Sequence, residues 1–279
     1  MKKRKRIILA LAAVALLLLG GTAFDNGLTV RHYAIQSDKV DEEITLVLIT
    51  DLHSTIHRNN QQSLIELIEK QKPDVILLAG DIADDEVPIL GTSMLLQGIG
   101  GLCPAYYVTG NHEYRSRRVG AVRAEIESYG VTILADESVM AEIGGTPLII
   151  GGVEDPDKRI YEEPGYNHFA AMEQAFGTLE RDETFKILLA HRPENIEEYV
   201  KYPFDLVVSG HAHGGQVRIP FLLNGLFAPN QGWFPPYAGG AYIHGETMHI
   251  VSRGLSISPL LPRVFNSPEL VVIALEPRK

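Results

Sequence analysis

Five short motifs of the sequence combine aspartate, asparagine and histidine, the side chains that bind divalent metals. The motifs are Asp51-x-His53, Gly80-Asp81-x-x-Asp84, Gly110-Asn111-His112-Glu113, His191 and Gly210-His211-x-His213. Carboxylate, imidazole and amide ligands without cysteine suit Mn, Fe or Zn better than Ca. Side chains two residues apart on an extended segment point the same way, so Asp51 and His53, or His211 and His213, can chelate one ion. The sequence therefore predicts a metal centre.

Each motif has an ordinary alternative when it is taken alone. A single Asp-x-His can cap a helix, a Gly-Asn pair can form a turn, and Gly-His-Ala-His can be an exposed loop. The joint occurrence of all five, each directly after an apolar run, favours a metal site over these alternatives. The remaining histidines fall outside the motifs and are expected to be surface or packed residues: His32, His57, His168, His244 and His249.

Apolar runs of strand length come directly before the motifs. These runs are Ile44–Thr50, Val75–Ala79, Tyr106–Thr109, Lys186–Ala190 and Leu206–Ser209. Continuous apolar runs are typical of strands in a sheet that is covered on both faces. Ligands of such α/β sheets bind at the carboxyl ends of the strands. We therefore expect five strands to deliver the motifs to one edge.

Helical and extended patterns alternate along most of the chain. Helices are predicted over Gln61–Lys70, Arg117–Tyr129, Phe169–Leu179 and Glu194–Lys201, and further strands over Val131–Leu134 and Leu148–Gly151. The final third predicts strands joined by Gly and Pro turns, at Gln216–Ile219, Ala241–His244, Met248–Ser252 and Leu270–Leu275. This alternation indicates an α/β fold with a mixed sheet, or two packed sheets, and helices on the outside.

The composition bounds the class of protein. The chain has 279 residues, is 45% hydrophobic and carries a net charge of -10, which favours one globular domain. An acidic protein repels nucleic-acid backbones, so no nucleic-acid-binding surface is expected. Bound divalent metals reverse the local field, so the acidity does not exclude a phosphorylated substrate. The single cysteine, Cys103, excludes an intramolecular disulfide and is expected to be a small packed residue.

The N-terminus resembles a membrane-targeting segment. Five consecutive basic residues, Lys2 to Arg6, precede the uncharged apolar run Ile7–Gly21. The basic flank should remain in the cytoplasm, which would place the rest of the chain outside. The run is shorter than the roughly 20 residues of a comfortable span, so a removable signal peptide competes with a permanent anchor. We expect residues 1–25 to be this signal anchor or signal peptide, and 26–279 the catalytic domain, secreted if cleavage occurs.

The ordered motifs resemble the calcineurin-like metallophosphoesterase superfamily, from about Ile44 to the C-terminus. The segments Gly210–Pro220 and Ser252–Leu275 are similar to a bacterial branch of membrane-associated phosphodiesterases. The resemblance implies a four-layer α/β/β/α sandwich and two divalent metal ions, for which Mn, Fe and Zn are the candidates.

The resemblance also implies a role for each motif residue. It makes Asp51, His53 and His213 ligands of one metal, Asn111, His191 and His211 ligands of the other, and Asp81 the bridge between them. His112 would contact the substrate, and Asp84 would orient His112. Glu113 is expected to be a supporting carboxylate without a chemical step of its own.

The implied chemistry is phosphoester hydrolysis. Two divalent ions about 3.5–4 Å apart would hold a shared water as a bridging hydroxide and bind two phosphoryl oxygens for in-line attack. We expect a phosphodiester or pyrophosphate hydrolase, its substrate lipid-linked if near a membrane, at the outer face of the cytoplasmic membrane. The alternatives are a phosphomonoesterase, a nucleotide-lipid pyrophosphatase, and a non-catalytic membrane-tethered scaffold, against which the intact ligand set argues.

Two further features have open interpretations. Four arginines near the motifs could hold a phosphate or could be solvated surface residues: Arg115, Arg117, Arg118 and Arg218. The segment Phe221–Tyr237 is rich in apolar residues, proline and glycine, and contains the single Trp233. It could form the wall of an apolar substrate groove or pack on the sheet as a structural loop.

Overall fold

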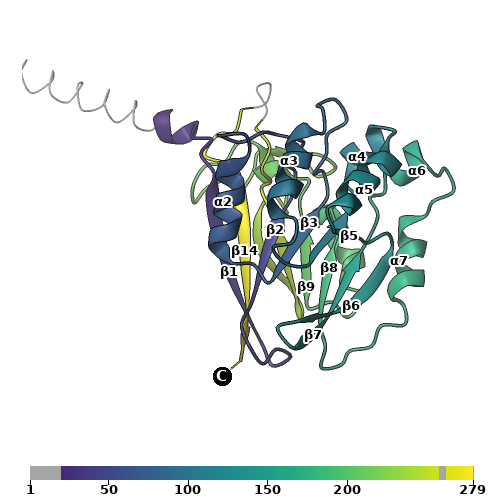
Figure 1. Cartoon of the computed structure of the whole chain (residues 1–279). Helices are drawn as coiled ribbons and strands as arrows, with labels where there is room; N and C mark the ends of the chain where they lie inside the picture. Colours follow the sequence, from purple (N-terminus) through teal and green to yellow (C-terminus); the bar gives the residue numbers. More distant parts are fainter. Residues whose placement is uncertain (1–19, 258–261, 279) are drawn as a thin grey trace, which may run out of the picture.

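Two six-stranded mixed sheets pack face to face in the computed structural model, which describes residues 20–257 and 262–278 (Figure 1). The first sheet has the order β1 (Thr29–Ser37), β14 (Glu269–Pro277), β2 (Ile44–Ile49), β3 (Val75–Ala79), β4 (Ala105–Val108) and β5 (Thr132–Ile133). The second has the order β12 (Gly240–His244), β13 (Thr247–Val251), β9 (Leu206–Ser209), β8 (Phe185–Leu189), β7 (Thr146–Gly152) and β6 (Glu137–Ile143).

Parallel pairing dominates the centre of both sheets. Strands β2, β3, β4 and β5 run parallel, whereas β14 is antiparallel to β2. Strands β13, β9, β8 and β7 also run parallel, with β12 and β6 antiparallel at the edges. A two-stranded ribbon is formed by β10 (Phe227–Ala228) and β11 (Gly232–Trp233). The parallel strands of each sheet therefore end at one edge.

Side chains of the central strands are buried on both faces. In β2, Leu46 and Leu48 pack between the two sheets, whereas Val47 and Ile49 pack against the helices. Alternate residues of a strand point to opposite faces, so a strand that is covered twice needs an apolar residue at every position. This explains the continuous apolar runs that precede the motifs.

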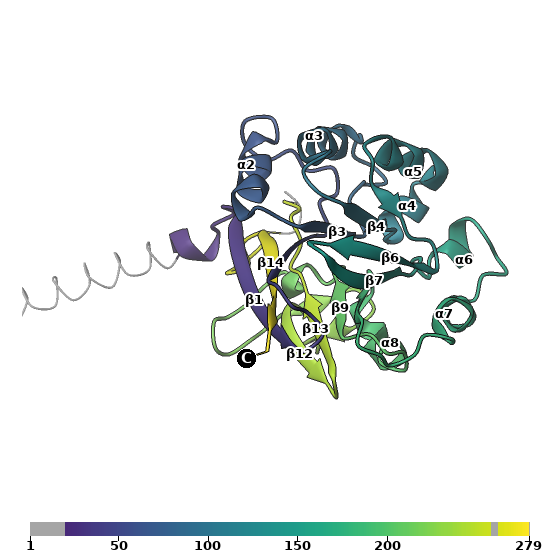
Figure 2. The same ribbon diagram turned by 60° about the horizontal axis from the view of Figure 1, so that its bottom comes forward.

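Helices cover the outer face of each sheet (Figure 2). On the first sheet these are α2 (Gln62–Gln71), α3 (Leu90–Ile99) and α5 (Val119–Ser128), and on the second α7 (His168–Phe176) and α8 (Ile196–Tyr199). Two short helices, α4 (Asn111–Arg115) and α6 (Lys158–Tyr161), lie in the connections. Helices, sheet, sheet and helices thus follow one another as layers.

The structure confirms the predicted α/β class and the two packed sheets, with one strand prediction wrong. Gln216–Ile219 forms only isolated bridges, one of them between Val217 and Val264. The backbone of Gln216 has a φ of 59°, so the chain turns there and cannot begin an extended strand. Strand β6 and helix α3 had not been predicted from the sequence.

The N-terminal prediction falls outside most of the described chain. Residues 7–19 of the apolar run are not described, so the membrane segment and the domain boundary at residue 25 stay predictions. Within residues 20–257 and 262–278, no helix is both long enough and apolar enough to cross a bilayer.

The histidines outside the motifs are packed or surface residues, as expected. His57, His168 and His249 are buried, and His32 is exposed. Burial, together with the charge of nearby His244, lowers the pKa of His249 to about 3.

Acid is therefore expected to weaken the fold through His249. The pKa in the fold is about 3 and that of an unfolded histidine about 6.5, so stability is complete above about pH 6.5 and falls as the pH decreases towards 3. At pH 5 the loss from this group is about 2 kcal/mol. Urea unfolding at pH 7 and pH 5 measures how much the free energy of unfolding decreases between the two pH values. This decrease should be about 2 kcal/mol smaller in His249→Gln than in the unchanged chain. An equal decrease in both chains would contradict the assignment.

Candidate metal centre

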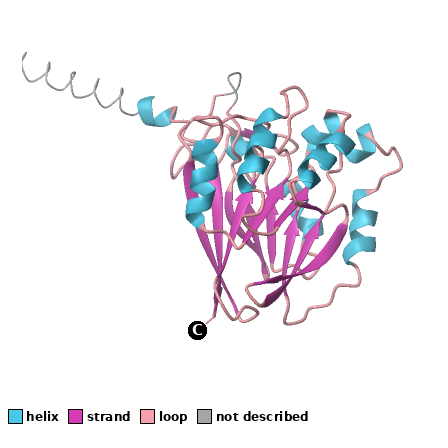
Figure 3. Cartoon of the chain, viewed as in Figure 1, coloured by secondary structure: helices cyan, strands magenta, loops and turns pink. Residues whose placement is uncertain are grey.

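The predicted motifs meet at one edge of the two sheets. Asp51 and His53 follow β2, Asp81 follows β3, and His191 follows β8. His211 and His213 follow β9, and Asn111 begins α4 directly after β4. These strands run in parallel within their sheets, and their arrowheads point to the same edge in Figure 3. The fold therefore brings Asp51 beside His211, which is 160 residues later in the chain, and beside His213.

Four overlapping groups of possible metal ligands form there among the described residues. Two of them contain His112, namely His53, Asp81 and His112, and Asp84, Asp85 and His112. The other two are the ligand sets Asp51, His53 and His213, and Asp81, His191 and His211, and the ligand atoms within each set lie within 4.8 Å of one another. Asp81 Oδ2 lies 3.0 Å from His191 Nε2 and 3.6 Å from His53 Nε2, so it lies between the sets. His191 Nε2 is also 4.0 Å from Asp51 Oδ1. The predicted ligands Asp51, His53 and His213 fall in one of these sets, and the assignment of each side chain to a particular ion stays a prediction.

Several buried polar atoms in this centre lack a hydrogen-bond partner among the described residues. They are Nε2 of His53, Nε2 of His191 and Oδ1 of Asn111. A buried polar atom without a partner costs about 1–3 kcal/mol. Imidazole nitrogens and amide oxygens have lone pairs that bind first-row divalent metals. The donor set and these unpaired atoms fit a site built for cations.

In both His53 and His191, the other ring nitrogen, Nδ1, contacts a neighbouring residue. His53 Nδ1 lies 2.9 Å from Asp84 Oδ2, and His191 Nδ1 donates to the backbone oxygen of Ala79 at 2.9 Å. Such contacts fix the ring and its tautomer, which leaves the Nε2 lone pair for a metal. Both rings are therefore preorganised.

His211 is held differently, through a loop residue. Asn230 Oδ1 lies 2.9 Å from His211 Nε2 and accepts a hydrogen bond from Arg192 at 2.7 Å. A proton on Nε2 that donates to Asn230 leaves Nδ1 of His211 free for a metal. Arg192 itself donates two hydrogen bonds to Asp155, at 2.6 and 2.9 Å. Sequence reasoning missed Arg192, Asn230 and Asp155, although Arg192 directly follows His191.

Burial and charge favour the metal-binding protonation states at Asp81 and His211 but not at Asp51 and His191. Burial opposes ionisation of Asp81, but the charge of His191, whose Nε2 lies 3.0 Å from Asp81 Oδ2, outweighs it and holds the pKa of Asp81 well below the usual range. Burial raises the pKa of Asp51. Burial would lower the pKa of His191, but the nearby carboxylates of Asp81 and Asp51 raise it to about 10. Burial, with the charges of Arg192 and His191, lowers the pKa of His211 to about 3. A neutral imidazole is the form that coordinates metals.

The backbone is strained at five of the motif residues. The φ angles are 49° at Asp51, 48° at His53, 52° at Asp81, 64° at His211 and 47° at His213. Residues other than glycine rarely adopt this left-handed region, and each such residue costs of order 1–3 kcal/mol. Strain of this kind concentrates at functional sites, because the surrounding structure must hold it.

The glycine before Asn111 is required by close approach. A Cβ atom at Gly110 would lie 2.2 Å from Asp81 Oδ1 and 2.5 Å from the Asp81 backbone nitrogen. Rotation of the Asp81 side chain cannot relieve the second contact.

Gly110→Ala is therefore expected to displace Asp81 and to abolish metal binding. Gly120→Ala is a matched control, because a Cβ there meets nothing within 4 Å and alanine favours the helix by about 1 kcal/mol. Metal content of the purified chains, together with their unfolding free energies, measures both effects. Full metal occupancy in Gly110→Ala would contradict this reading.

Glu113 supports the turn that carries Asp81, as expected. Its buried carboxylate accepts hydrogen bonds from the backbone N–H groups of Gly110, Asp81, Ile82 and Ala83, at 2.7 to 3.0 Å. Burial and the charge of Asp81 raise the pKa of Glu113 to about 7. The side chain joins the two loops that follow β3 and β4.

His112 is held by two carboxylates. Its Nδ1 lies 2.5 Å from Asp85 Oδ1 and 3.3 Å from Asp84 Oδ2. Burial would lower the pKa of His112, but the hydrogen bond to Asp84 and the charges of Asp81 and Asp85 raise it to about 9. The family resemblance implied that Asp84 orients His112, but Asp85 makes the shorter contact with His112 and Asp84 also contacts His53.

In the described part of the chain, the four arginines near the motifs and Cys103 make no hydrogen bond or ion pair with the two ligand sets, whereas Asn230 of the segment Phe221–Tyr237 contacts His211. Arg115, Arg117 and Arg118 are exposed, and Arg218 lines a separate cavity. Burial raises the pKa of Cys103 to about 11, which makes it a poor nucleophile.

The comparisons with known proteins agree with this geometry. The family model for the calcineurin-like phosphoesterases matches residues 44–215. A Helicobacter pylori protein described as an uncharacterised metallophosphoesterase is 29% identical over 262 residues, which cover 89% of this chain and 64% of that protein. The chain thus spans less than two thirds of that relative.

Two further matches cover much of the chain. An uncharacterised metallophosphoesterase of Aquifex aeolicus is 30% identical, over 89% of this chain and 92% of that protein. The structure of the NAD nucleotidase of Haemophilus influenzae matches with a TM-score of 0.51 at 16% identity, over 77% of this chain and 46% of that one. At that identity the structural match shows the fold alone.

Proposed function

The chain belongs to the calcineurin-like phosphoesterase family, whose members are phosphoric ester hydrolases with a dinuclear metal site, and from that premise we propose that it hydrolyses phosphodiester or pyrophosphate bonds. The observation that carries this proposal is the position of Asp81 between two sets of metal-binding side chains. Two divalent cations bound there would supply a nucleophile from water and neutralise phosphoryl oxygens.

Seven side chains would hold these cations. We propose Asp51, His53 and His213 for one ion, Asn111, His191 and His211 for the other, and Asp81 for both. Nitrogen and oxygen donors without a thiolate favour Mn, Fe or Zn.

His112 is the residue that we propose to move a proton. Its ring lies beside that of His53, with 4.3 Å between the ring centroids, so it borders the metal-binding set. With Nδ1 held by Asp85 and Asp84, the Nε2 proton would pass to the leaving oxygen as its bond to phosphorus breaks.

Two neighbouring carboxylates should give different defects. Asp85→Asn is expected to lower turnover about 10- to 100-fold with metal content unchanged, because Asp85 contacts His112. Asp84→Asn should also weaken metal binding about 10- to 100-fold, because Asp84 holds the ring of His53. Metal titrations and kcat values for both variants measure this difference. Identical behaviour of the two variants, or loss of metal in Asp85→Asn, would refute it.

The charge around the site supports a diester over a monoester. Arg192 reaches the site but is bound to Asp155, Asp157 and Asn230, so its positive charge is already matched. A diester carries one negative charge and a monoester up to two. Beyond the two proposed cations and His112, Arg192 offers no spare charge for the second negative charge of a monoester, which we take to favour the diester.

Hydrolysis of model substrates tests the proposal. The purified full chain is freed of metal with a chelator and reloaded with Mn, Fe or Zn. Faster turnover of bis-p-nitrophenyl phosphate than of p-nitrophenyl phosphate is the expected result. The reverse order would favour the phosphomonoesterase alternative. Metal binding without turnover of either compound, or of a panel of lipid and nucleotide pyrophosphates, would favour the scaffold.

The location is also a proposal. The basic residues Lys2 to Arg6 and the apolar run after them support an N-terminal anchor that places the catalytic domain at the outer face of the cytoplasmic membrane. The full chain should pellet with membranes at high salt, and a chain that starts at Asp25 should remain in the supernatant. Equal partition of the two chains would contradict the anchor.

A further inference from the structure

Arginines line a cavity of about 450 Å³ beside the place where the N-terminal segment joins the fold. Arg31 of β1, Arg218 and Arg253 contribute to its wall, as does Phe265. The backbone N–H of Phe265 donates to the backbone oxygen of Ala23 at 2.6 Å. Ala23, just after the end of the apolar run, therefore lies next to this arginine cavity. None of the cavity residues belongs to the two metal-binding sets.

Positive charge in the arginine cavity is not fully matched. Arg253 Nε lies 2.9 Å from Glu269 Oε2, and Arg31 Nε lies 3.9 Å from the same oxygen. Arg218 donates from Nη2 to the neutral amide of Asn224, and its buried Nη1 has no hydrogen-bond partner among the described residues. Burial and the charge of Arg253 lower the pKa of Arg218 to about 10, which leaves it cationic at neutral pH. Three guanidinium groups thus share one carboxylate.

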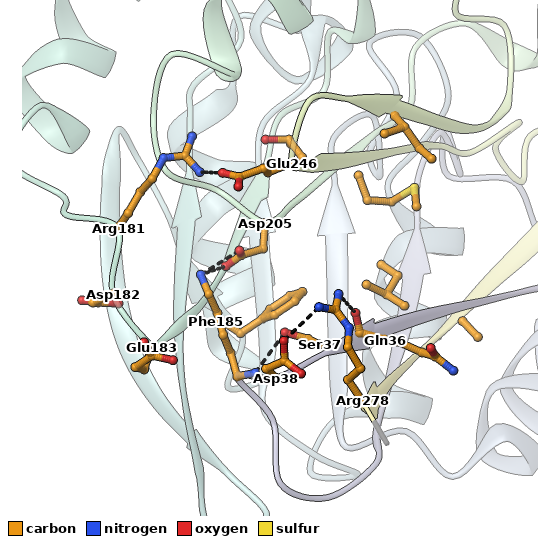
Figure 4. Close-up of a pocket in the computed structure, with 16 residues that line it drawn as sticks. Gln36, Ser37, Asp38, Arg181, Asp182, Glu183, Phe185, Asp205, Glu246 and Arg278 are labelled. Atoms are coloured by element: carbon orange, nitrogen blue, oxygen red, sulfur yellow. Dashed lines mark hydrogen bonds and ion pairs between the residues drawn. The ribbon is translucent and has the colours of Figure 1, made fainter.

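A second cavity, of about 620 Å³ at the opposite end of the sheets, has matched charges (Figure 4). Its three cations each contact a carboxylate, in the pairs Arg181–Glu246 at 2.6 Å, Lys39–Asp205 at 2.8 Å and Arg278–Asp38 at 2.9 Å. The arginine cavity differs in this respect from the cavity of Figure 4. An anionic ligand would satisfy both the excess charge and the unpaired Nη1 atom of Arg218.

Apolar side chains stand at the rim of the arginine cavity. Phe221 is fully exposed and Leu222 is 84% exposed, and both line the cavity. The φ of Phe221 is 67°, and the turn is closed by a hydrogen bond of 2.9 Å from the Leu222 N–H to the Ile219 oxygen. The fold thus holds two large apolar groups in water in a strained turn. Apolar groups beside unmatched basic ones are typical of surfaces that bind anionic membranes.

We propose that the arginine cavity binds the phosphate of an anionic phospholipid headgroup at a bilayer surface, with Phe221 and Leu222 entering the acyl boundary. Arg218 donates from Nη1 to the phosphate, and Arg31 and Arg253 balance its charge. This contact goes beyond the proposed hydrolysis, because it uses none of the metal-binding residues. With the N-terminal segment beside it, the contact would fix how the domain lies on the membrane.

Fluorescence quenching by brominated lipid tests the insertion of the turn. The full chain carrying Trp233→Phe and Leu222→Trp is reconstituted into phosphatidylcholine vesicles with or without phosphatidylglycerol. Quenching in the phosphatidylglycerol vesicles should be at least twice that in phosphatidylcholine alone. The control carries Met140→Trp in place of Leu222→Trp. Met140 is also well exposed, at 71%, but it lies on β6, an edge strand of the second sheet, whereas the arginine cavity includes Arg31 of β1 in the first sheet. Equal quenching of the two chains, or none of either, would overturn the proposal.

Arginine variants test the headgroup contact. Adding Arg218→Gln to the Leu222→Trp chain should return quenching to the phosphatidylcholine level, whereas Arg181→Gln, at the opposite end, should leave it unchanged. If Arg218→Gln fails to fold, Arg31→Gln provides the same test at a half-exposed side chain. Unchanged quenching in the folded variant would contradict the contact.

A soluble assay separates a lipid headgroup from free phosphate. Short-chain phosphatidylglycerol should raise the Tm of the full chain in neutral detergent, and short-chain phosphatidylcholine should not. An equal rise with inorganic phosphate would mean a general phosphate site and overturn the lipid assignment. None of these measurements depends on catalysis, so failure of the proposed hydrolysis would leave their outcome unaffected.

Discussion

Asp81→Ala is expected to remove both metal ions and to lower hydrolysis by more than about a thousandfold. The loss of a single charge-stabilising group from an active site already costs about 10²–10³ in turnover. Asp81 lies between the two ligand sets, 3.0 Å from His191 Nε2 and 3.6 Å from His53 Nε2, so its removal affects both. Elemental analysis and turnover of bis-p-nitrophenyl phosphate measure the two effects.

The controls for this prediction separate chemistry from folding. Asp81 Oδ1 also accepts the backbone N–H of His112 at 2.8 Å, so alanine leaves that donor unpaired. Asp81→Asn has nearly the same shape but lacks the charge, and it should fold and still bind metal poorly. Asp38→Asn removes an exposed carboxylate at the opposite end of the sheets and should change neither quantity. Two bound ions in Asp81→Ala would exclude Asp81 as the bridge.

His112→Ala is expected to lower turnover about 10²- to 10⁴-fold, the usual contribution of a general acid, with metal content retained. His191 is held by the backbone of Ala79 and His211 by Asn230, so removal of the His112 ring leaves both of these hydrogen bonds in place. Its own contacts go to Asp85 and Asp84. The defect should therefore appear in kcat, and a substrate with a good leaving group should be affected less.

The matched control for His112 is His32→Ala, which replaces an exposed histidine of β1 and should leave the kinetics unchanged. A His112→Ala chain that loses its metal but keeps full activity per bound ion would show that His112 is a ligand and not the proton donor.

The position of the metal centre could be predicted from the sequence because its physical signals are local. Each motif follows a run in which both strand faces are apolar, as in β3 with its five buried residues. Parallel strands end at one edge, so Asp51 and Asp81 had to meet once the strands were recognised, whereas the position of His191 after β8 also depends on how the second sheet packs on the first.

Long-range contacts could not be predicted in the same way. Asn230 lies in the turn between β10 and β11 and contacts His211, which is 19 residues earlier in the chain, and no local pattern encodes that contact. The choice between Asp84 and Asp85 depends on a turn in which Asp84 Oδ1 accepts the N–H groups of Glu86 and Val87, which leaves Oδ2 for the histidines.

Diffraction from crystals of the full chain loaded with manganese tests the central claim most directly. Anomalous scattering should show two peaks about 3.5–4 Å apart, one on each side of the Asp81 carboxylate. A single peak, or peaks that Asp51 and His191 do not contact, would contradict a centre in which these side chains hold a pair of cations.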